Sequence, residues 1–204
     1  MSRKAFLLLL GAGSLLAYGC GSDSSQSALR DGMAAFNEKN YTEAITQLTR
    51  ATQRITDSAD LYYHLGAAHL EKGELEPAVA AFNAALELNP RHGEALAGLG
   101  QVAYYKKDLP KAQAYFGQAL AAPVSSDDAK ACVLNGLALT EVGLQRNDLA
   151  RLYLLRAQQS SRKYAPSLYN LASLYRDAYN LREEALDQFE LFLHVADKRD
   201  PYYE

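Results

Sequence analysis

Tryptophan is absent from this sequence, and cysteine and histidine are scarce, with two and four residues among 204. Cys20 and Cys132 lie far apart, and Cys20 closes an apolar leader, so a disulfide framework is not supported. The 21 basic residues face 24 acidic ones, and neither sign forms a long run. Nucleic-acid binding needs a concentrated basic face that neutralises phosphates. We therefore exclude nucleic acid as a partner.

The sequence also lacks the residue patterns of catalytic and metal sites. His64 and His69 are five residues apart, and no glutamate completes the H-E-x-x-H motif of zinc hydrolases. No lysine or histidine adjoins Cys132 to lower the pKa of its thiol, so we interpret it as a packing residue. The mature chain has no glycine-rich phosphate loop. We predict a protein that is not an enzyme, with no catalytic residue, metal, cofactor or small-molecule substrate.

Residues 1–19 have the pattern of an export signal. Arg3 and Lys4 supply a positive start, and residues 5–16 are apolar but too short to span a bilayer comfortably. Residues 16–20, Leu-Ala-Tyr-Gly-Cys, resemble a bacterial lipobox, although Ala17 and Tyr18 depart from the usual leucine and small residue. The resemblance implies that Cys20 carries a lipid. The alternative is that Cys20 only lies near an ordinary cleavage site.

A polar segment follows the leader. Residues 20–27 are rich in serine and glycine, which predicts a flexible tether between the lipid and a folded domain over residues 28–204. The expected location is the bacterial cell envelope, with a lipid anchor in the outer membrane facing the periplasm.

The rest of the chain is internally repetitive. Small residues recur at intervals of 34, 34, 38 and 34, at Gly32, Gly66, Gly100, Ala138 and Ala172. A second series recurs at intervals of 34, 34, 38 and 35, at Ala44, Ala78, Ala112, Ala150 and Ala185. A large apolar residue follows each alanine by four positions: Leu48, Phe82, Phe116, Leu154 and Phe189. This period predicts a helix hairpin repeated five times, in which small residues allow the two helices to approach closely.

The repeat resembles the tetratricopeptide family, whose pattern has an aromatic residue, Leu-Gly, then A-x₃-F and a proline. The nearest copy uses Tyr62, Leu65-Gly66, Ala78, Phe82 and Pro90. The resemblance implies an all-α solenoid with a right-handed superhelix. The predicted repeats cover about residues 25–58, 59–92, 93–126, 131–164 and 165–198.

Three departures from the repeat carry expectations of their own. Asp31 replaces the leucine of the other units, which fits an outermost helix that faces water. Residues 121–128 add four residues and predict a longer loop, with Ser126 or Asp127 capping the next helix. Glu141 replaces an aromatic or apolar residue in the fourth unit.

The resemblance implies that the first helix of each unit lines a concave groove. Helical periodicity brings aromatic, amide and a few charged side chains to that face. The candidate partner-binding residues are Arg30, Met33, Tyr63, His64, Gln101, Tyr104, Tyr105, Asn135, Tyr169, Asn170, Ser173 and Arg176. Such a surface suits an extended or helical peptide, because aromatic rings give a large contact area and amides pair with backbone groups. Many of these tyrosines could instead pack between helices.

Together these features predict an envelope scaffold that binds a protein or peptide, in the manner of small repeat lipoproteins that assist pilus or outer-membrane protein assembly. The alternative is an adaptor that recruits a peptidoglycan- or polysaccharide-acting enzyme complex. Both rest on likeness of fold.

The lipid anchor is tested by Cys20→Ala. Without the acceptor sulfur, the protein should be soluble or remain unprocessed, and it should leave the detergent-extracted membrane fraction. Fractionation followed by immunoblotting measures this. Unchanged partition into membranes would contradict lipidation at Cys20.

Overall fold

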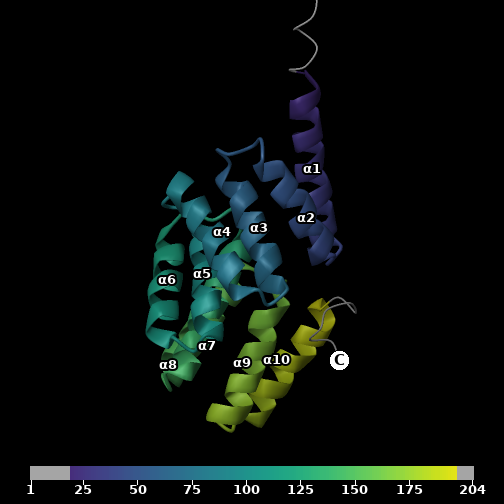
Figure 1. Cartoon of the computed structure of the whole chain (residues 1–204). Helices are drawn as coiled ribbons and strands as arrows, with labels where there is room; N and C mark the ends of the chain where they lie inside the picture. Colours follow the sequence, from purple (N-terminus) through teal and green to yellow (C-terminus); the bar gives the residue numbers. More distant parts are fainter. Residues whose placement is uncertain (1–18, 197–204) are drawn as a thin grey trace, which may run out of the picture.

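The computed structural model describes residues 19–196, and every regular element in this range is an α-helix (Figure 1). The ten helices are α1 (Gly19–Asn37), α2 (Tyr41–Thr52), α3 (Ala59–Glu71), α4 (Leu75–Leu88), α5 (Gly93–Tyr105), α6 (Leu109–Ala121), α7 (Asp127–Gly143), α8 (Asn147–Ser160), α9 (Ala165–Ala178) and α10 (Arg182–Val195). They form five hairpins, α1/α2 to α9/α10, and each hairpin packs on the next. The predicted all-α solenoid is confirmed.

Polar side chains fix where several helices begin. Asn40, Ser58, Asp108 and Ser126 each accept a hydrogen bond from the backbone N–H three residues further on. These bonds satisfy N–H groups that have no partner inside the helix, and each cap contributes about 1 kcal/mol. Ser126 is the capping residue expected after the longer loop.

One residue of each hairpin turn has a left-handed backbone, with φ between 54° and 77°. These residues are Lys39, Gly73, Lys107, Gln145 and Asn180, spaced like the repeat itself. Only Gly73 avoids the steric cost of a Cβ, which is about 1 kcal/mol at the other four positions. In the first four hairpins the next N–H bonds to the carbonyl five residues earlier, whereas in the fifth hairpin it bonds to the carbonyl six residues earlier. Four hairpins therefore share one turn geometry that residue type alone does not reveal.

The N-terminal helix is longer than the sequence suggested. Residues 20–27 were expected to be a flexible tether, but the structure includes them in α1. Ser25 and Ala28 are only 5% and 1% exposed, so packing stabilises a helix that a serine-rich composition does not favour. The predicted leader lies outside the described residues except for Gly19, and so does the side chain of Cys20.

Phe82 on α4 forms the central contact between the second and third hairpins. A Cβ on Gly66 of α3 would lie 2.7 Å from the Phe82 ring, and a Cβ on Gly98 of α5 would lie 2.4 Å from it. Both distances are shorter than any real Cβ contact, so the ring fits only because both neighbours are glycine. One side chain thus joins its own hairpin to the next.

Phe116 repeats this arrangement one unit later. It lies between Gly100 of its own hairpin and Gly136 of α7 in the next, where added Cβ atoms would approach to 2.9 and 2.5 Å. In the first hairpin Leu48 packs in the same way on Gly32. Gly98 and Gly136 were not part of the predicted pattern, although they are 38 residues apart, which is the length of the third repeat with its longer loop.

The fourth and fifth units vary this scheme. Glu141 is fully buried, where its carboxylate accepts a hydrogen bond from Gln113 Nε2 at 2.6 Å and lies 3.5 Å from Arg146. This partner on α6 explains why an acid is tolerated in the core. In the fifth unit Phe192 takes the place of the alanine found in the other units and is buried, while Phe189 is only half-buried.

The odd-numbered helices form the inner layer of the stack. The backbones of α1, α3, α5, α7 and α9 approach one another in succession, whereas within the described residues no two even-numbered helices do so. The inner layer is therefore the more tightly spaced one, and the stack curves around it.

The glycine contacts predict opposite effects at two glycines of the same stack. Gly98→Ala should lower the free energy of unfolding by about 1 to 3 kcal/mol, because its methyl group overlaps Phe82. Gly117 is exposed on α6 with open space around it, so Gly117→Ala should raise the free energy of unfolding by roughly 0.8 kcal/mol, because alanine has the higher helix propensity. Urea unfolding measures both. Equal effects at the two sites would contradict the packing scheme.

Candidate partner-binding face

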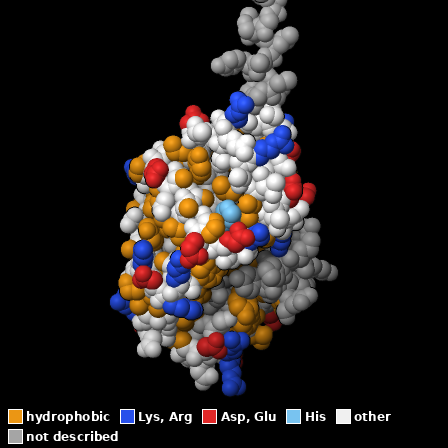
Figure 2. All heavy atoms as spheres, in the orientation of Figure 1, with side chains coloured by type: hydrophobic (Ala, Val, Ile, Leu, Met, Phe, Trp, Pro, Cys, Tyr) orange, Lys and Arg blue, Asp and Glu red, His pale blue; other side chains and the backbone are white. Residues whose placement is uncertain are grey.

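The candidate face is the exposed side of the odd-numbered helices, called the inner face below. On the face seen in Figure 2, acidic and basic side chains are interspersed with hydrophobic ones, and hydrophobic side chains gather over α4–α6 and over α9 and α10. An open cavity of about 360 Å³ lies elsewhere, between α7 and α8, and none of the predicted partner-binding residues lines it.

Tyr63 is the centre of an aromatic cluster on this face. Its ring centroid lies 5.0 Å from that of His64 and 5.3 Å from that of His92. It also contacts Phe82, with the ring centroids 6.3 Å apart. Tyr63 is therefore partly a packing residue, which is the alternative left open for the tyrosines of this face.

His92 connects the second and third hairpins. Its side chain is buried, its Nδ1 accepts a hydrogen bond from the backbone N–H of Ala95, and its Nε2 lies 3.0 Å from Asp60 Oδ1. Because Nδ1 accepts, Nε2 carries the proton and donates to the carboxylate. The ring both caps α5 and ties it to α3.

Acidic groups surround Tyr63. Burial is the main cause that raises the pKa of Tyr63 to about 12, and Cys132, Glu94, Asp60 and Glu71 add to it. Burial also lowers the pKa of His64 below its usual value. Burial alone would raise the pKa of Glu94, but hydrogen bonds from Ser125 outweigh it and the pKa is lowered. The neutral forms of Tyr63 and His64 are thus favoured.

Cys132 lies on the same side of the stack. Burial raises the pKa of its thiol above the ordinary value, which favours the unreactive protonated form. This agrees with its interpretation as a packing residue. Among the described residues no group of three or more histidines, cysteines, aspartates or glutamates is placed to hold a metal ion.

The structure separates the predicted partner-binding residues by exposure. Four are exposed: Arg30, Met33, Tyr105 and Arg176. Seven are half-buried: Tyr63, His64, Gln101, Tyr104, Tyr169, Asn170 and Ser173. Asn135 is buried, at 7% exposure. Of the four exposed ones, Arg176 is held by Asp177 through two hydrogen bonds of 2.6 and 2.9 Å.

Two of these residues, His64 and Asn170, face the preceding hairpin. They occupy the repeat position of Gly98, whose contact is Phe82 of the hairpin before it. The His64 ring accordingly makes an edge-on contact with the Phe36 ring of α1, with the centroids 6.2 Å apart. The Nδ2 of Asn170 donates to Asn135 Oδ1 at 2.8 Å, so these two amides pair with each other.

The sequence reasoning missed two acidic residues at this face. Asp60 and Glu94 sit in the first turns of α3 and α5, and both carboxylates lie within 3.5 Å of His92. Their spacing of 34 residues was a visible signal. The sequence alone does not single them out, because acids in a first turn also have a purely local role at the positive end of a helix.

The raised pKa of Tyr63 predicts a dependence of stability on pH. The folded chain holds the Tyr63 proton more tightly than the unfolded chain, so this contribution is complete below pH 10 and is lost as the pH rises through about 12. Between these values the wild type should lose roughly 2 kcal/mol more than Tyr63→Phe. Urea unfolding at several pH values measures the difference. Parallel losses in both chains would show that Tyr63 ionises as an ordinary tyrosine.

Residues 59–92 match the sequence model of the tetratricopeptide repeat family. The chain is also 31% identical over 80 residues to photosystem I assembly protein Ycf3 of Rippkaea orientalis. That match covers 38% of this chain and 46% of Ycf3, so it spans less than half of either protein.

Solved structures resemble the chain over most of its length. One described as the functional characterisation of Pseudomonas aeruginosa pilF has a TM-score of 0.72 and 19% identity, and covers 88% of this chain and 80% of its own. PilW, described as a widely conserved type IV pilus biogenesis factor, has a TM-score of 0.72 and 17% identity, and the match covers 84% of this chain and 77% of PilW. TTC0263, a thermophilic TPR protein of Thermus thermophilus, has a TM-score of 0.73 and 22% identity, and the match covers 86% of this chain and 93% of TTC0263.

At such identities these likenesses establish the fold alone. The sequence match at residues 59–92 supplies the family pattern for one hairpin, and the structure shows the same hairpin five times between residues 19 and 196. Residues 59–92 therefore carry the tetratricopeptide repeat pattern, and the described chain has the fold of a tetratricopeptide-like solenoid.

Proposed function

We propose that this chain is a scaffold of the bacterial cell envelope that binds a protein or peptide on its inner face during assembly of a pilus or an outer-membrane protein. The observation that carries the binding role is the inner face itself: a continuous layer of odd-numbered helices on which Tyr105 and Met33 are exposed. Exposed apolar groups on a rigid stack favour recognition of another chain.

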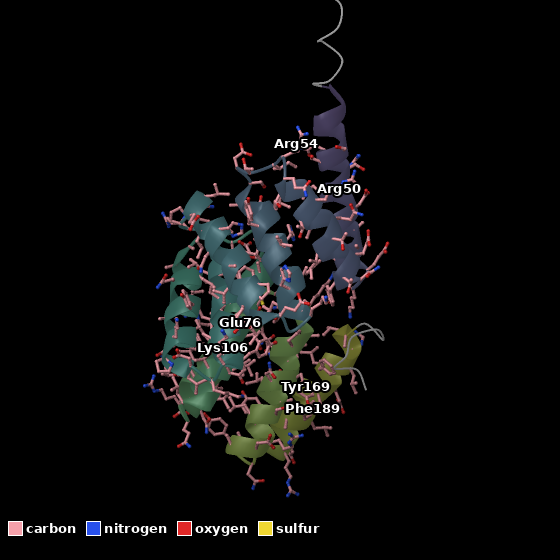
Figure 3. All side chains as sticks on the ribbon, in the orientation of Figure 1. Arg50, Arg54, Glu76, Lys106, Tyr169 and Phe189 are labelled. Carbon is pink, nitrogen blue, oxygen red and sulfur yellow. The ribbon has the colours of Figure 1, made fainter. Side chains whose placement is uncertain are left out.

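Tyr105 and Met33 are exposed apolar anchors among the predicted residues of this face. Tyr105 is 58% exposed at the end of α5, and its ring lies 6.2 Å from that of Tyr104, which in turn contacts the Lys107 ammonium at 5.5 Å. The Lys106 ammonium lies 3.0 Å from the Glu76 carboxylate, in an exposed ion pair between the end of α5 and α4 (Figure 3). An aromatic side chain on a packed helix loses little entropy when it binds a partner.

The envelope location rests on the leader and on the lipobox resemblance at Cys20. Similarity of fold to PilF and PilW supports a role in pilus assembly by analogy. Among the described residues no helix is long and apolar enough to cross a membrane.

Photo-cross-linking in cells that express the chain natively tests the binding role. Benzoylphenylalanine at position 105 should yield a discrete adduct with one partner, because this position is exposed and belongs to the proposed binding face. The control is position 118, which is exposed on α6 in the outer layer. Equal adducts at both positions, or none at position 105, would contradict the proposal.

The identity of the adduct tests the finer assignment. A pilus or outer-membrane assembly component supports it, whereas a peptidoglycan- or polysaccharide-acting enzyme would replace it with the adaptor role.

A further inference from the structure

Helix α10 lacks the cover that every other even-numbered helix has. Helices α2, α4, α6 and α8 each pack against the odd-numbered helix that follows them. Within residues 19–196 no helix follows α10, which lies at one end of the stack (Figure 1).

On α4, α6 and α8 two positions contact the next hairpin. They are the first and the eighth residue after the conserved alanine. On α4 they are Val79 and Leu86, which pack in a cluster with α5. On α6 they are Gln113, which donates to Glu141 of α7 at 2.6 Å, and Leu120, which packs against α7. On α8 they are Arg151, which lies 5.7 Å from the Tyr179 ring centroid, and Gln158, which donates to Gln188 at 2.8 Å.

On α10 the same two positions are Leu186 and Leu193. They are 58% and 53% exposed, so the side chains placed to contact a following helix are apolar and uncovered. Phe189 lies between them in sequence, at the repeat position of Phe82 and Phe116. It is half-buried, in edge-to-face contact with Tyr169 at 5.7 Å (Figure 3).

Acidic side chains border these leucines. Glu183 and Glu190 are exposed one helical turn from Leu186, and neither forms an ion pair or side-chain hydrogen bond in the described part of the chain. Asp187 and Glu184 on the same helix are also exposed, and Arg182 is the only lysine or arginine in α10. This charge favours a basic partner.

A second copy of this chain does not fit. At the N-terminal end of the stack, Asp31 replaces the leucine that α3, α5, α7 and α9 turn toward the preceding hairpin, and Ser27 donates to it at 3.2 Å. Stacking α1 on α10 would bring Asp31 against the two leucines and near Glu190. Two α10 helices packed together would bring their acidic residues into repulsion.

Pro201 disfavours a continuous helix across residues 197–204, because proline has no backbone N–H to donate inside a helix.

We propose that α10 receives an amphipathic helix of a basic partner protein, which packs as the next odd-numbered helix of the stack. The side of the partner helix that faces α10 has a leucine that packs against Leu186 and Leu193. The residue before this leucine is a glycine, which lies over Phe189. The pairs Gly98-Leu99 and Gly136-Leu137 have this arrangement inside the stack. Lysine or arginine beside this leucine and glycine pairs with Glu183 and Glu190. This surface is separate from the inner face and does not depend on its function.

Fluorescence anisotropy of the full chain tests the proposal with two labelled synthetic peptides. Both have the sequence of residues 93–105, which contains Gly98-Leu99; one is flanked by lysine pairs and the other by glutamate pairs. The lysine-flanked peptide should bind at least tenfold more tightly. Leu186→Ser with Leu193→Ser should weaken its binding at least tenfold, with an unchanged circular dichroism spectrum because both leucines are exposed.

The matched control is Leu149→Ser with Leu152→Ser, which changes two similarly exposed leucines of α8 and should leave binding unchanged. Equal binding of the two peptides, no binding of either, or an equal loss in the control would overturn the proposal. So would self-association of the full chain, seen by light scattering, that the Leu186/Leu193 variant abolishes, because the occupant would then be a second copy. A tenfold gain in affinity on deleting residues 197–204 would show that the chain's own segment covers α10.

Discussion

The close approach of an aromatic ring to two glycines on different helices sets the spacing of the second, third and fourth hairpins. Phe82 touches α3 through Gly66 and α5 through Gly98, and Phe116 repeats the contact between Gly100 and Gly136. Each ring contacts both the other helix of its own hairpin and the first helix of the next hairpin. The same side chain therefore sets the distance between the two helices of a hairpin and the distance between neighbouring hairpins. The odd-numbered helices are drawn into one layer, and this layer presents the inner face.

The same constraint explains why the two ends of the stack differ. No described hairpin precedes α1, so its outer side does not have to pack closely on another helix. At the two positions that hold Gly98 and Leu99 in α5, helix α1 has Arg30 and Asp31, which are exposed. Helix α10 keeps the apolar side chains of an internal helix, Leu186 and Leu193, without a described helix to cover them. A stack built from equivalent units thus ends in a polar surface on one side and an apolar one on the other.

The period of 34 residues was enough to predict the hairpins and their packing residues, because small side chains recur at a fixed interval where paired helices must approach closely. The second glycine series was not recognised, since two members, Gly98 and Gly136, are too few to stand out without the longer loop between them. The left-handed residues of the turns include two lysines and a glutamine, which composition does not associate with that conformation. The site was predicted less well: helical periodicity placed His64, Asn135 and Asn170 on the inner face, but it could not show that a neighbouring hairpin buries or pairs them.

The central claim is that Phe82 and Gly98 share one space, and a double-mutant cycle measures this most directly. Urea unfolding of Phe82→Leu, Gly98→Ala and the double variant gives their coupling free energy. If the ring and the methyl group compete, Gly98→Ala should cost at least about 1 kcal/mol less in the Phe82→Leu chain than in the wild type. Costs that add to within about 0.4 kcal/mol would contradict the account, because the two residues would then not share the contact that spaces the stack.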